Sequence, residues 1–483
     1  MWTRGSARLL PSSSPNYDES TEIRIGQSRS TECWASFGEP LTAPAPPIAS
    51  SGTLRRVTAR RPRPTAPLAL AAALLLGACA AVDEPGEPSL QSGGPRSACD
   101  FGLSPERTAE ENRDALQAAI DWASPRGAAL WIEPSEEPYP LASGLRLRRN
   151  VSLLGAHGPV GRGTRGSAKA QPVGSAFAVR DGAKALVEVE SATRIEGLQF
   201  WYPEQALTEP AAIQEYPPTI RVAQDQPVYG VTLSRLSFFG ESFAMDFEAS
   251  ARFPCEQILI EHCTGYPLSG RFVSIDHCTD VPRVLHCHVN PANRRLFAGD
   301  AAPPLINAVV ARGTFAFAVD HTDDAVLEDL FAFGTYGGAS LGPASYGQLT
   351  GFGFDCVTIG VRKGGDSDFN RDWMIAQGSI VANTGKSVAD VHPLVVEGRG
   401  HLAVTNVQAF SGPNAALTTL GRSRDFLLVR GGERLTVSLV GCRMRGYEQA
   451  EPVTLENPRA TVSLVGCFDR DERPCEGVPG LRP

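Results

Sequence analysis

Short apolar stretches recur along most of the chain with a spacing in the twenties. The heptapeptide Thr436–Cys442 (TVSLVGC) returns unchanged as Thr461–Cys467, 25 residues later. A looser pattern places an apolar residue three positions before another apolar residue and five before a Phe or Cys. It fits, in full or shortened form, at Ile195/Leu198/Phe200, Leu233/Leu236/Phe238, Ile260/Cys263 and Val284/Cys287. Such a period is typical of a solenoid, in which stacked coils bury one continuous apolar interior.

A helix is predicted at the start of this region. Apolar residues over Glu110–Trp122 keep helical spacing. Thr108 and Glu111 form a capping box in front of it, while Pro125 and Gly127 end it. Three short strands are expected to follow, at Ala129–Ile132, Leu145–Leu147 and Val151–Gly155.

The same segments carry a family resemblance. They are Asp100-Phe101-Gly102, Glu111–Asp121 (ENRDALQAAID), Gly127–Pro134 (GAALWIEP), Leu145-x-Leu147 and Val151–Gly155. Together they resemble the opening of pectate-lyase-like right-handed β-helix proteins, which include rhamnogalacturonase-like and epimerase-like members. The resemblance departs at Ser135-Glu136-Glu137, where the family has a P-x-G turn. It implies an all-β, right-handed parallel β-helix (a solenoid) with a short N-terminal capping helix and a surface groove for polysaccharide.

The composition divides the chain into five parts. Residues 1–53 are rich in Ser, Pro and Thr without periodicity, and are expected to be disordered or untranslated. A signal peptide over 54–78 and a flexible Pro/Gly-rich tether over 79–98 precede the β-helix at 99–475. A short tail, 476–483, ends the chain.

The predicted signal peptide is of the lipoprotein type. Arginines precede an apolar run, Leu68–Leu76, that is too short to span a bilayer. The run ends in Leu76-Gly77-Ala78-Cys79, which resembles the lipobox of bacterial lipoproteins. That resemblance implies lipidation of Cys79, export, and membrane anchoring at the bacterial outer membrane or cell surface.

The charge of the chain argues against nucleic acid as a partner. Lys and Arg number 45 against 53 Asp and Glu, a net charge of −8, and residues 1–78 are net basic, so the body is more acidic still. Binding of phosphates needs clustered Lys and Arg.

The densest group of carboxylates is Asp320-His321-Thr322-Asp323-Asp324. We predict Asp320, Asp323 and Asp324 as catalytic, because one carboxyl can donate a proton while another activates water. The pair Asp323-Asp324 distantly resembles the paired aspartates of polygalacturonases. However, the Asn-x-Asp, Gly-His-Gly and Arg-Ile-Lys signatures of those hydrolases are absent, and a solvated turn remains the alternative.

Other side chains are candidates for substrate binding. Arg271 and Arg283 could hold a uronate carboxylate. His286 shares a pattern position with His262, so the two are expected to stack as a polar ladder, a metal site or a substrate contact. Aromatic rings stack on sugars or pack under loops, and the two candidates for this role are Trp201 and Tyr202.

A loop after residue 365 resembles a calcium site. Its oxygen ligands alternate as Asp366, Asp368, Asn370 and Asp372, which is the spacing that Ca²⁺ loops use. The loop lacks the Gly and Glu expected at its sixth and twelfth positions, so a polar turn is the alternative.

The cysteines admit two arrangements. Cys263 and Cys287 should stack on neighbouring coils, as a buried ladder or as a disulfide, while Cys467 and Cys475 could staple the C-terminal end.

Taken together, the sequence predicts an exported, lipid-anchored β-helix that engages an extracellular polysaccharide and cleaves it by lyase or glycosidase chemistry. The alternative is a non-catalytic carbohydrate-binding or structural surface protein.

Overall fold

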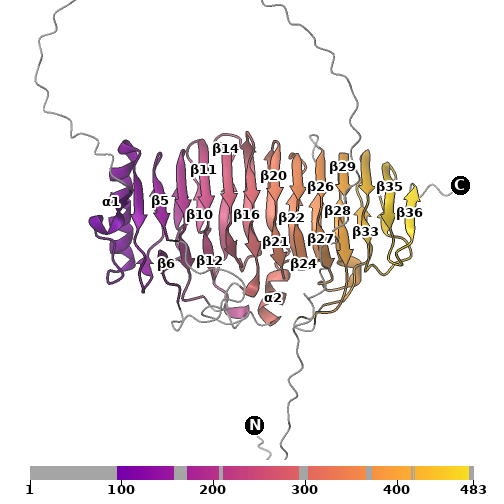
Figure 1. Ribbon diagram of the computed structural model, residues 1–483, viewed down its shortest axis with the longest axis horizontal. Helices are drawn as coiled ribbons and strands as arrows, with labels where there is room; N and C mark the ends of the chain where they lie inside the picture. Colours follow the sequence, from indigo (N-terminus) through magenta and orange to yellow (C-terminus); the bar gives the residue numbers. More distant parts are fainter. Residues whose placement is uncertain are drawn as a thin grey trace, which may run out of the picture. The chain divides into compact units, whose positions relative to one another are not determined.

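The computed structural model describes residues 95–156, 171–205, 210–292, 303–365, 372–414, 417 and 419–477. In these ranges the chain winds through successive coils of three short strands. Each strand pairs in parallel with its equivalents in the coils before and after it, so the strands stand side by side along the stack (Figure 1). The predicted parallel β-helix is confirmed.

The strands form three parallel sheets, named here in the order in which a coil visits them. Sheet 1 contains β1 (Arg96–Ser97), β2 (Ala129–Ile132), β5 (Ser152–Gly155), β8 (Thr193–Glu196), β11 (Val228–Ser234), β14 (Cys255–Glu261), β17 (Arg283–Leu285), β20 (Ala325–Glu328), β23 (Gly347–Thr350), β26 (Trp373–Ala376), β29 (Gly400–Thr405), β32 (Leu435–Val440) and β35 (Ala460–Phe468). Sheet 2 contains β3 (Tyr139–Leu141), β6 (Ala176–Val179), β9 (Gln199–Trp201), β12 (Ser237–Phe239), β15 (Thr264–Gly265), β18 (His288–Val289), β21 (Phe331–Phe333), β24 (Gly353–Val357), β27 (Ser379–Ala382), β30 (Gln408–Phe410) and β33 (Arg443–Met444). Sheet 3 contains β4 (Leu145–Leu147), β7 (Val187–Val189), β10 (Ile220–Val222), β13 (Phe243–Glu248), β16 (Arg271–Thr279), β19 (Phe315–Thr322), β22 (Gly337–Leu341), β25 (Ile359–Lys363), β28 (His392–Val396), β31 (Leu427–Val429) and β34 (Val453–Leu455). The last strand, β36 (Pro474–Gly477), runs antiparallel to β35.

The repeated heptapeptide occupies equivalent places in two neighbouring coils. Val437 pairs with Val462, and the register continues without a shift from the start of β32 to its end. Both valines are fully buried. Equal positions of the sequence repeat therefore form straight columns through the interior, as the spacing predicted.

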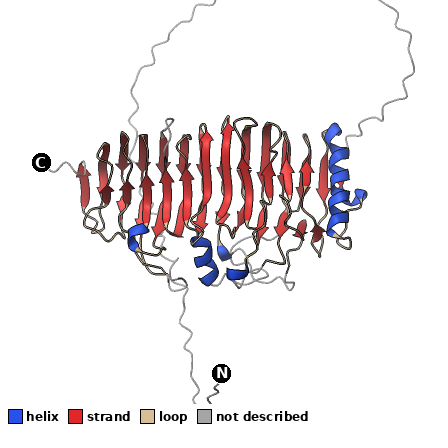
Figure 2. Cartoon of the chain, turned by 180° about the vertical axis from the view of Figure 1, so that it is seen from behind, coloured by secondary structure: helices blue, strands red, loops and turns tan. Residues whose placement is uncertain are grey.

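A helix covers the first coil. Helix α1 (Ala109–Ala123) begins at the predicted capping box of Thr108 and Glu111, and its buried face is centred on Leu116 and Ile120. Figure 2 shows α1 at one end of the stack, with a short helical turn beside it and further helical segments, including α2 (Pro303–Val310), along one long edge. The 3₁₀ turns are η1 (Ala98–Phe101), η2 (Ser124–Arg126), η3 (Pro210–Ala212) and η5 (Val388–Asp390).

The ordered body begins slightly earlier than the sequence predicted. Strand β1 pairs with β2 through Arg96 and Ser97, and Ala98 is fully buried. These three residues were assigned to the tether, but their backbone hydrogen bonds and burial place them in the first coil.

The corner between sheets 1 and 2 requires a left-handed backbone in coil after coil. His262, His286, Asp329 and Asn406 occupy it with φ between 51° and 54°. Gly, Asn, Asp and His tolerate this region best, which explains why the repeat carries them between its apolar positions.

Buried cysteines stack on neighbouring coils, and none of the described cysteines forms a disulfide. Cys255 pairs with Cys278 in register, Cys263 lies above Cys287, and all nine cysteines of the described ranges are free. Burial raises the pKa of the Cys263 thiol well above its usual range. Cys467 and Cys475, the predicted C-terminal staple, occupy paired positions of β35 and β36. Their thiols are free in this structure, so no disulfide links them.

No helix within the described ranges is long and apolar enough to cross a membrane. The predicted signal peptide, its lipobox and Cys79 lie outside these ranges.

The aromatic column inside sheet 2 gives a direct test of the core. Phe177, Phe200 and Phe238 stack with ring centroids 6.0 and 5.4 Å apart, and Phe238 is fully buried. Replacing Phe238 by Ala should lower the free energy of unfolding by about 3–5 kcal/mol, because a cavity opens between the coils. The matched control is Phe468→Ala, whose ring is 39% exposed. Denaturant unfolding of both variants measures the difference, and equal losses would contradict this core.

Candidate functional site

Two hollows lie beside each other on the outside of the β-helix, near the corner where sheet 3 leads into sheet 1. The first, named the trough, has a volume of about 340 Å³ and is lined by Glu248, Ser274, Ile275, Asp276, Ala318, Val319, Asp320, Ser340, Gly342, Pro343, Arg362, Gly364 and Gly365. The second, named the corner pocket, has a volume of about 360 Å³ and is lined by Pro254, His277, Thr279, His321, Thr322, Asp323 and Ala344. The strands β16 and β19 contribute to both.

The trough is hollow because small residues occupy equivalent positions in consecutive coils. Ser274 pairs with Ala318, and Ala318 pairs with Ser340. At its end, a Cβ added to Gly342 would lie 2.3 Å from Cγ of Asp320, so only glycine leaves room for that carboxylate.

A column of carboxylates runs along the side of the trough. Glu248 pairs with Asp276, and Asp276 pairs with Asp320, so one acidic side chain stands on each of three consecutive coils. Adjacent strands are about 4.8 Å apart, which brings neighbouring carboxylates of the column within reach of one ligand.

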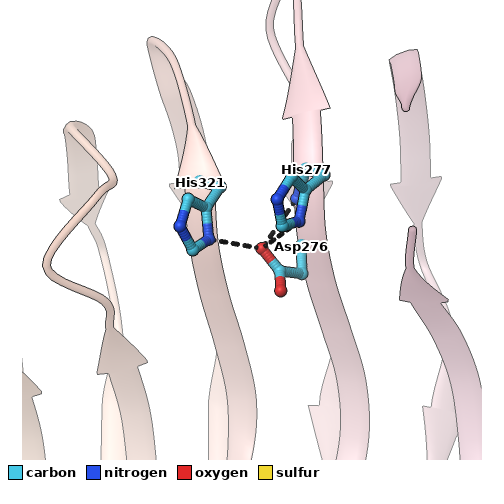
Figure 3. A group of neighbouring side chains, drawn as sticks. All are labelled: Asp276, His277 and His321. Carbon is cyan, nitrogen blue, oxygen red and sulfur yellow. Dashed lines mark hydrogen bonds and ion pairs between the residues drawn. The ribbon is translucent and has the colours of Figure 1, made fainter. Parts of the chain in front are cut away.

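The carboxylate of Asp276 joins two histidines (Figure 3). Its Oδ1 atom lies 2.9 Å from Nδ1 of His321, on the next coil, and 3.0 Å from Nδ1 of His277, its chain neighbour. The two imidazole rings stack with centroids 4.3 Å apart and planes 12° from parallel. The stack follows from the register, because each histidine comes directly after one of the paired aspartates.

The three predicted catalytic aspartates have different surroundings. Asp320 faces the trough, and its Oδ1 accepts hydrogen bonds from the backbone N–H groups of His321 and Ala344, at 2.9 and 3.1 Å. Asp323 lines the corner pocket, and its Oδ1 is buried without a hydrogen-bond partner. Asp324 is exposed, and its Oδ2 accepts a hydrogen bond of 3.4 Å from the hydroxyl of Tyr346. Asp320 therefore lines the trough and Asp323 the corner pocket, while Asp324 is exposed and lines neither hollow.

The predicted substrate-binding arginines lie on different faces. Arg271 begins β16 in sheet 3, where it forms an exposed ion pair with Glu248 at 3.4 Å. Arg283 begins β17 in sheet 1 and donates to the carbonyl oxygen of Val281. The structure does not bring the two guanidinium groups together on one carboxylate.

The aromatic candidates lie on sheet 2, away from the aspartates. Trp201 ends β9 and is half-buried. Tyr202 is only 2% exposed, and its hydroxyl lies 2.7 Å from Oγ1 of Thr219. Tyr202 is thus packed inside the domain rather than presented to a ligand.

His286 belongs to the ladder that the sequence predicted. Its ring stacks on that of His262, with centroids 4.7 Å apart, and its Nδ1 lies 2.9 Å from Oδ2 of Asp329. All three residues occupy left-handed corner positions. The geometry is that of a polar ladder at the corner between sheets 1 and 2.

The predicted calcium loop lies largely outside the described ranges. Asp366, Asp368 and Asn370 fall there, and only Asp372 is described. Its Oδ1 accepts the backbone N–H of His401 at 2.9 Å. Binding of Ca²⁺ to this loop stays a prediction.

The positive charges beside the trough are already paired. Arg221 lies 2.9 Å from Asp246, and Arg362 lies 2.8 Å from Glu397. Burial raises the pKa of the Asp246 carboxyl and lowers the pKa of Lys363, next to the trough, to about 8. Both arginines are therefore committed to carboxylates, as Arg271 is to Glu248.

The sequence did contain a signal for Asp276 and His277 as partners of the predicted aspartates. An Asp-His pair occurs at Asp276-His277 and again at Asp320-His321. The insertion that contains α2 lies between them and lengthens the spacing beyond the usual period, so the two pairs were not aligned with each other.

Comparisons with known proteins bear on the fold. No family model and no curated protein sequence matches the chain. Among solved structures, the pre-mature gene product 12 of bacteriophage phi29 matches with a TM-score of 0.50 and 11% identity, over 79% of this chain and 58% of that one. The tailspike protein of the E. coli bacteriophage HK620 matches with a TM-score of 0.49 and 11% identity, over 78% of this chain and 66% of that one. The A-module of the mannuronan C-5 epimerase AlgE6 of Azotobacter vinelandii matches with a TM-score of 0.39 and 14% identity, over 77% of this chain and 99% of that one. At such identities the likeness shows the fold alone, a parallel β-helix.

Proposed function

We propose that this chain engages a polysaccharide along the trough of sheet 3 and cleaves it where the trough meets the corner pocket. The observation that carries the proposal is the pair of adjoining hollows with Asp320 in one and Asp323 in the other. A long, shallow outer face suits an extended polymer. The resemblance of residues 100–155 to pectate-lyase-like proteins supports a glycan as that polymer.

The two aspartates offer the groups that glycan cleavage needs. Asp320 is held in one orientation by two backbone N–H donors, and Asp323 lines the adjoining corner pocket. A pair of carboxyl groups can divide the work, one protonating the leaving oxygen and the other acting as base or nucleophile.

The electrostatics favour glycosidase over lyase chemistry. A lyase must stabilise the charge that forms when a base removes the proton beside a uronate carboxylate. The guanidinium group of Arg362, which lines the trough, and that of Arg271, whose partner Glu248 lines it, are both committed to carboxylates. Hydrolysis needs no such cation, so glycosidase chemistry is the form of the proposal that these contacts support.

Substitution of the aspartates tests the catalytic part of the proposal. Asp320→Asn and Asp323→Asn should each reduce glycan cleavage by at least about 100-fold, because each removes one acid–base group and keeps the shape of the side chain. Asp324→Asn is the matched control and should change the rate little. The assay incubates the purified body with a panel of neutral glycans and polyuronates and measures new reducing ends and ultraviolet absorbance.

The products separate the alternatives. Reducing ends without absorbance support a glycosidase, whereas absorbing unsaturated ends would show a lyase. Binding without turnover would replace the catalytic proposal by a non-catalytic binding protein. Full activity in the Asp320→Asn/Asp323→Asn double variant would reject this site.

We also propose that the chain is exported and anchored to the membrane by a lipid on Cys79. The proposal rests on the lipobox-like Leu76–Cys79 and on the basic and apolar segments before it. The acidic, Pro- and Gly-rich residues that follow would hold the β-helix away from the membrane surface.

The anchor has a simple test in a bacterial host that processes lipoproteins. Cys79→Ala should move the protein from the membrane fraction to the soluble fraction, because the thiol that carries the lipid is lost. Cys99→Ala, which changes the next cysteine of the chain, is the control and should stay with the membrane. Recovery of the Cys79→Ala variant in the membrane fraction would count against the anchor.

A further inference from the structure

We propose that Asp276, His277 and His321 form a binding site for a divalent transition-metal ion of the Zn²⁺ type. They are brought together by two consecutive coils, β16 supplying Asp276 and His277 and β19 supplying His321 (Figure 3). The proposal goes beyond the glycan function and does not depend on it.

The donor atoms have the number and chemistry that such an ion prefers. One ligand atom from each residue lies within 4.8 Å of the other two, and the described residues contain no other such group of three. The central Oδ1 of Asp276 is 2.9 and 3.0 Å from the two Nδ1 atoms. Two imidazoles and one carboxylate suit Zn²⁺ and its first-row neighbours, and three protein ligands leave one position open.

One unsatisfied polar atom lies within the proposed site. Nδ1 of His277 is buried, and although it lies 3.0 Å from Asp276 it makes no hydrogen bond of acceptable geometry. Burying a polar atom without a hydrogen-bond partner costs free energy, so the unpaired Nδ1 of His277 needs a structural explanation. An ion bound at His277 would satisfy this atom.

Stacking alone does not make the case. His262 and His286 stack with nearly the same geometry, 4.7 Å and 15°, because both occupy left-handed corner positions. That pair lacks a carboxylate shared by both rings. Asp276 supplies the shared ligand at the other corner, and this difference provides an internal control.

The ring planes set a condition on binding. Because the two rings are 12° from parallel, their in-plane lone pairs run side by side, and both must turn about the Cβ–Cγ bond to converge on one ion. The side chain of His321 is 49% exposed and that of His277 is 27% exposed, so both rings reach the surface, where they can turn and where solvent gives the ion access.

The test is calorimetric titration of the metal-free full-length protein with Zn²⁺, in the absence of any glycan. We expect a site with a dissociation constant of about 1 μM or tighter and a rise in melting temperature. His277→Asn, His321→Asn and Asp276→Asn should each weaken this site by at least about tenfold. Asn tolerates the left-handed backbone of the two histidines, which keeps the fold intact.

The control is the double variant His262→Asn/His286→Asn, which removes the other imidazole stack and should bind Zn²⁺ like the parent. Circular dichroism and melting of each metal-free variant confirm that it is folded. The proposal is overturned if the parent binds no Zn²⁺ at this affinity, or if the three substitutions leave binding unchanged. It is overturned equally if the control weakens binding as much as they do. Activity on glycans has no part in the readout, so a failure here leaves the proposed function standing.

Discussion

The hydrogen-bonded register between neighbouring coils is the constraint on which the whole structure depends. Each strand pairs in parallel with its equivalents above and below, so residues that occupy the same place in the repeat lie about 4.8 Å apart. Inside the domain this register makes columns of apolar side chains that bury one another. Outside, it brings Asp276 and His321, which are 45 positions apart in sequence, to within 2.9 Å.

The same constraint explains how the outer face of the β-helix acquires chemistry. Each outward-facing polar residue lies next to the residue at the equivalent position of the adjacent coil. Where both coils carry the same type of side chain at that position, the two side chains can contact one ligand. Glu248, Asp276 and Asp320 form such a column. The adjoining column consists of small side chains that leave the space of the trough open, namely Ser274, Ala318 and Ser340. The trough and its acidic side are thus two columns of one sheet.

Much of the fold could be predicted because the repeat is written locally. The identical heptapeptides were sufficient to predict the solenoid, and the capping box of Thr108 was sufficient to predict the start of its first helix. The helix α2 was not predicted, because it lies in an insertion that carries no trace of the repeat. The start of the body was misplaced by three residues, since the pairing of Arg96 and Ser97 with β2 leaves no periodic signal in so short a strand.

The candidate site was only partly predictable, mainly because the alternation of inward-facing and outward-facing residues along each strand was not applied to every candidate. In a strand alternate residues face the same side, so Tyr202, two positions after the inward-facing Phe200, had to point inward as well. Local density found Asp320 and Asp323, because they lie in one short segment. It could not link Asp276 and His277 to His321, because that contact exists only across two coils separated by an insertion.

The most direct test of this account measures whether equal positions of the repeat are vertical neighbours. Ser438 and Ser463 face outward on adjacent coils, in register, and Ala403 lies one coil further along. After substitution by cysteine, the pair at 438 and 463 should form a disulfide on mild oxidation, because their Cα atoms are about 4.8 Å apart. The pair at 403 and 463, at about twice that separation, should not. Equal linking of both pairs, or of neither, in peptide mass spectra would contradict the columns and every surface feature derived from them.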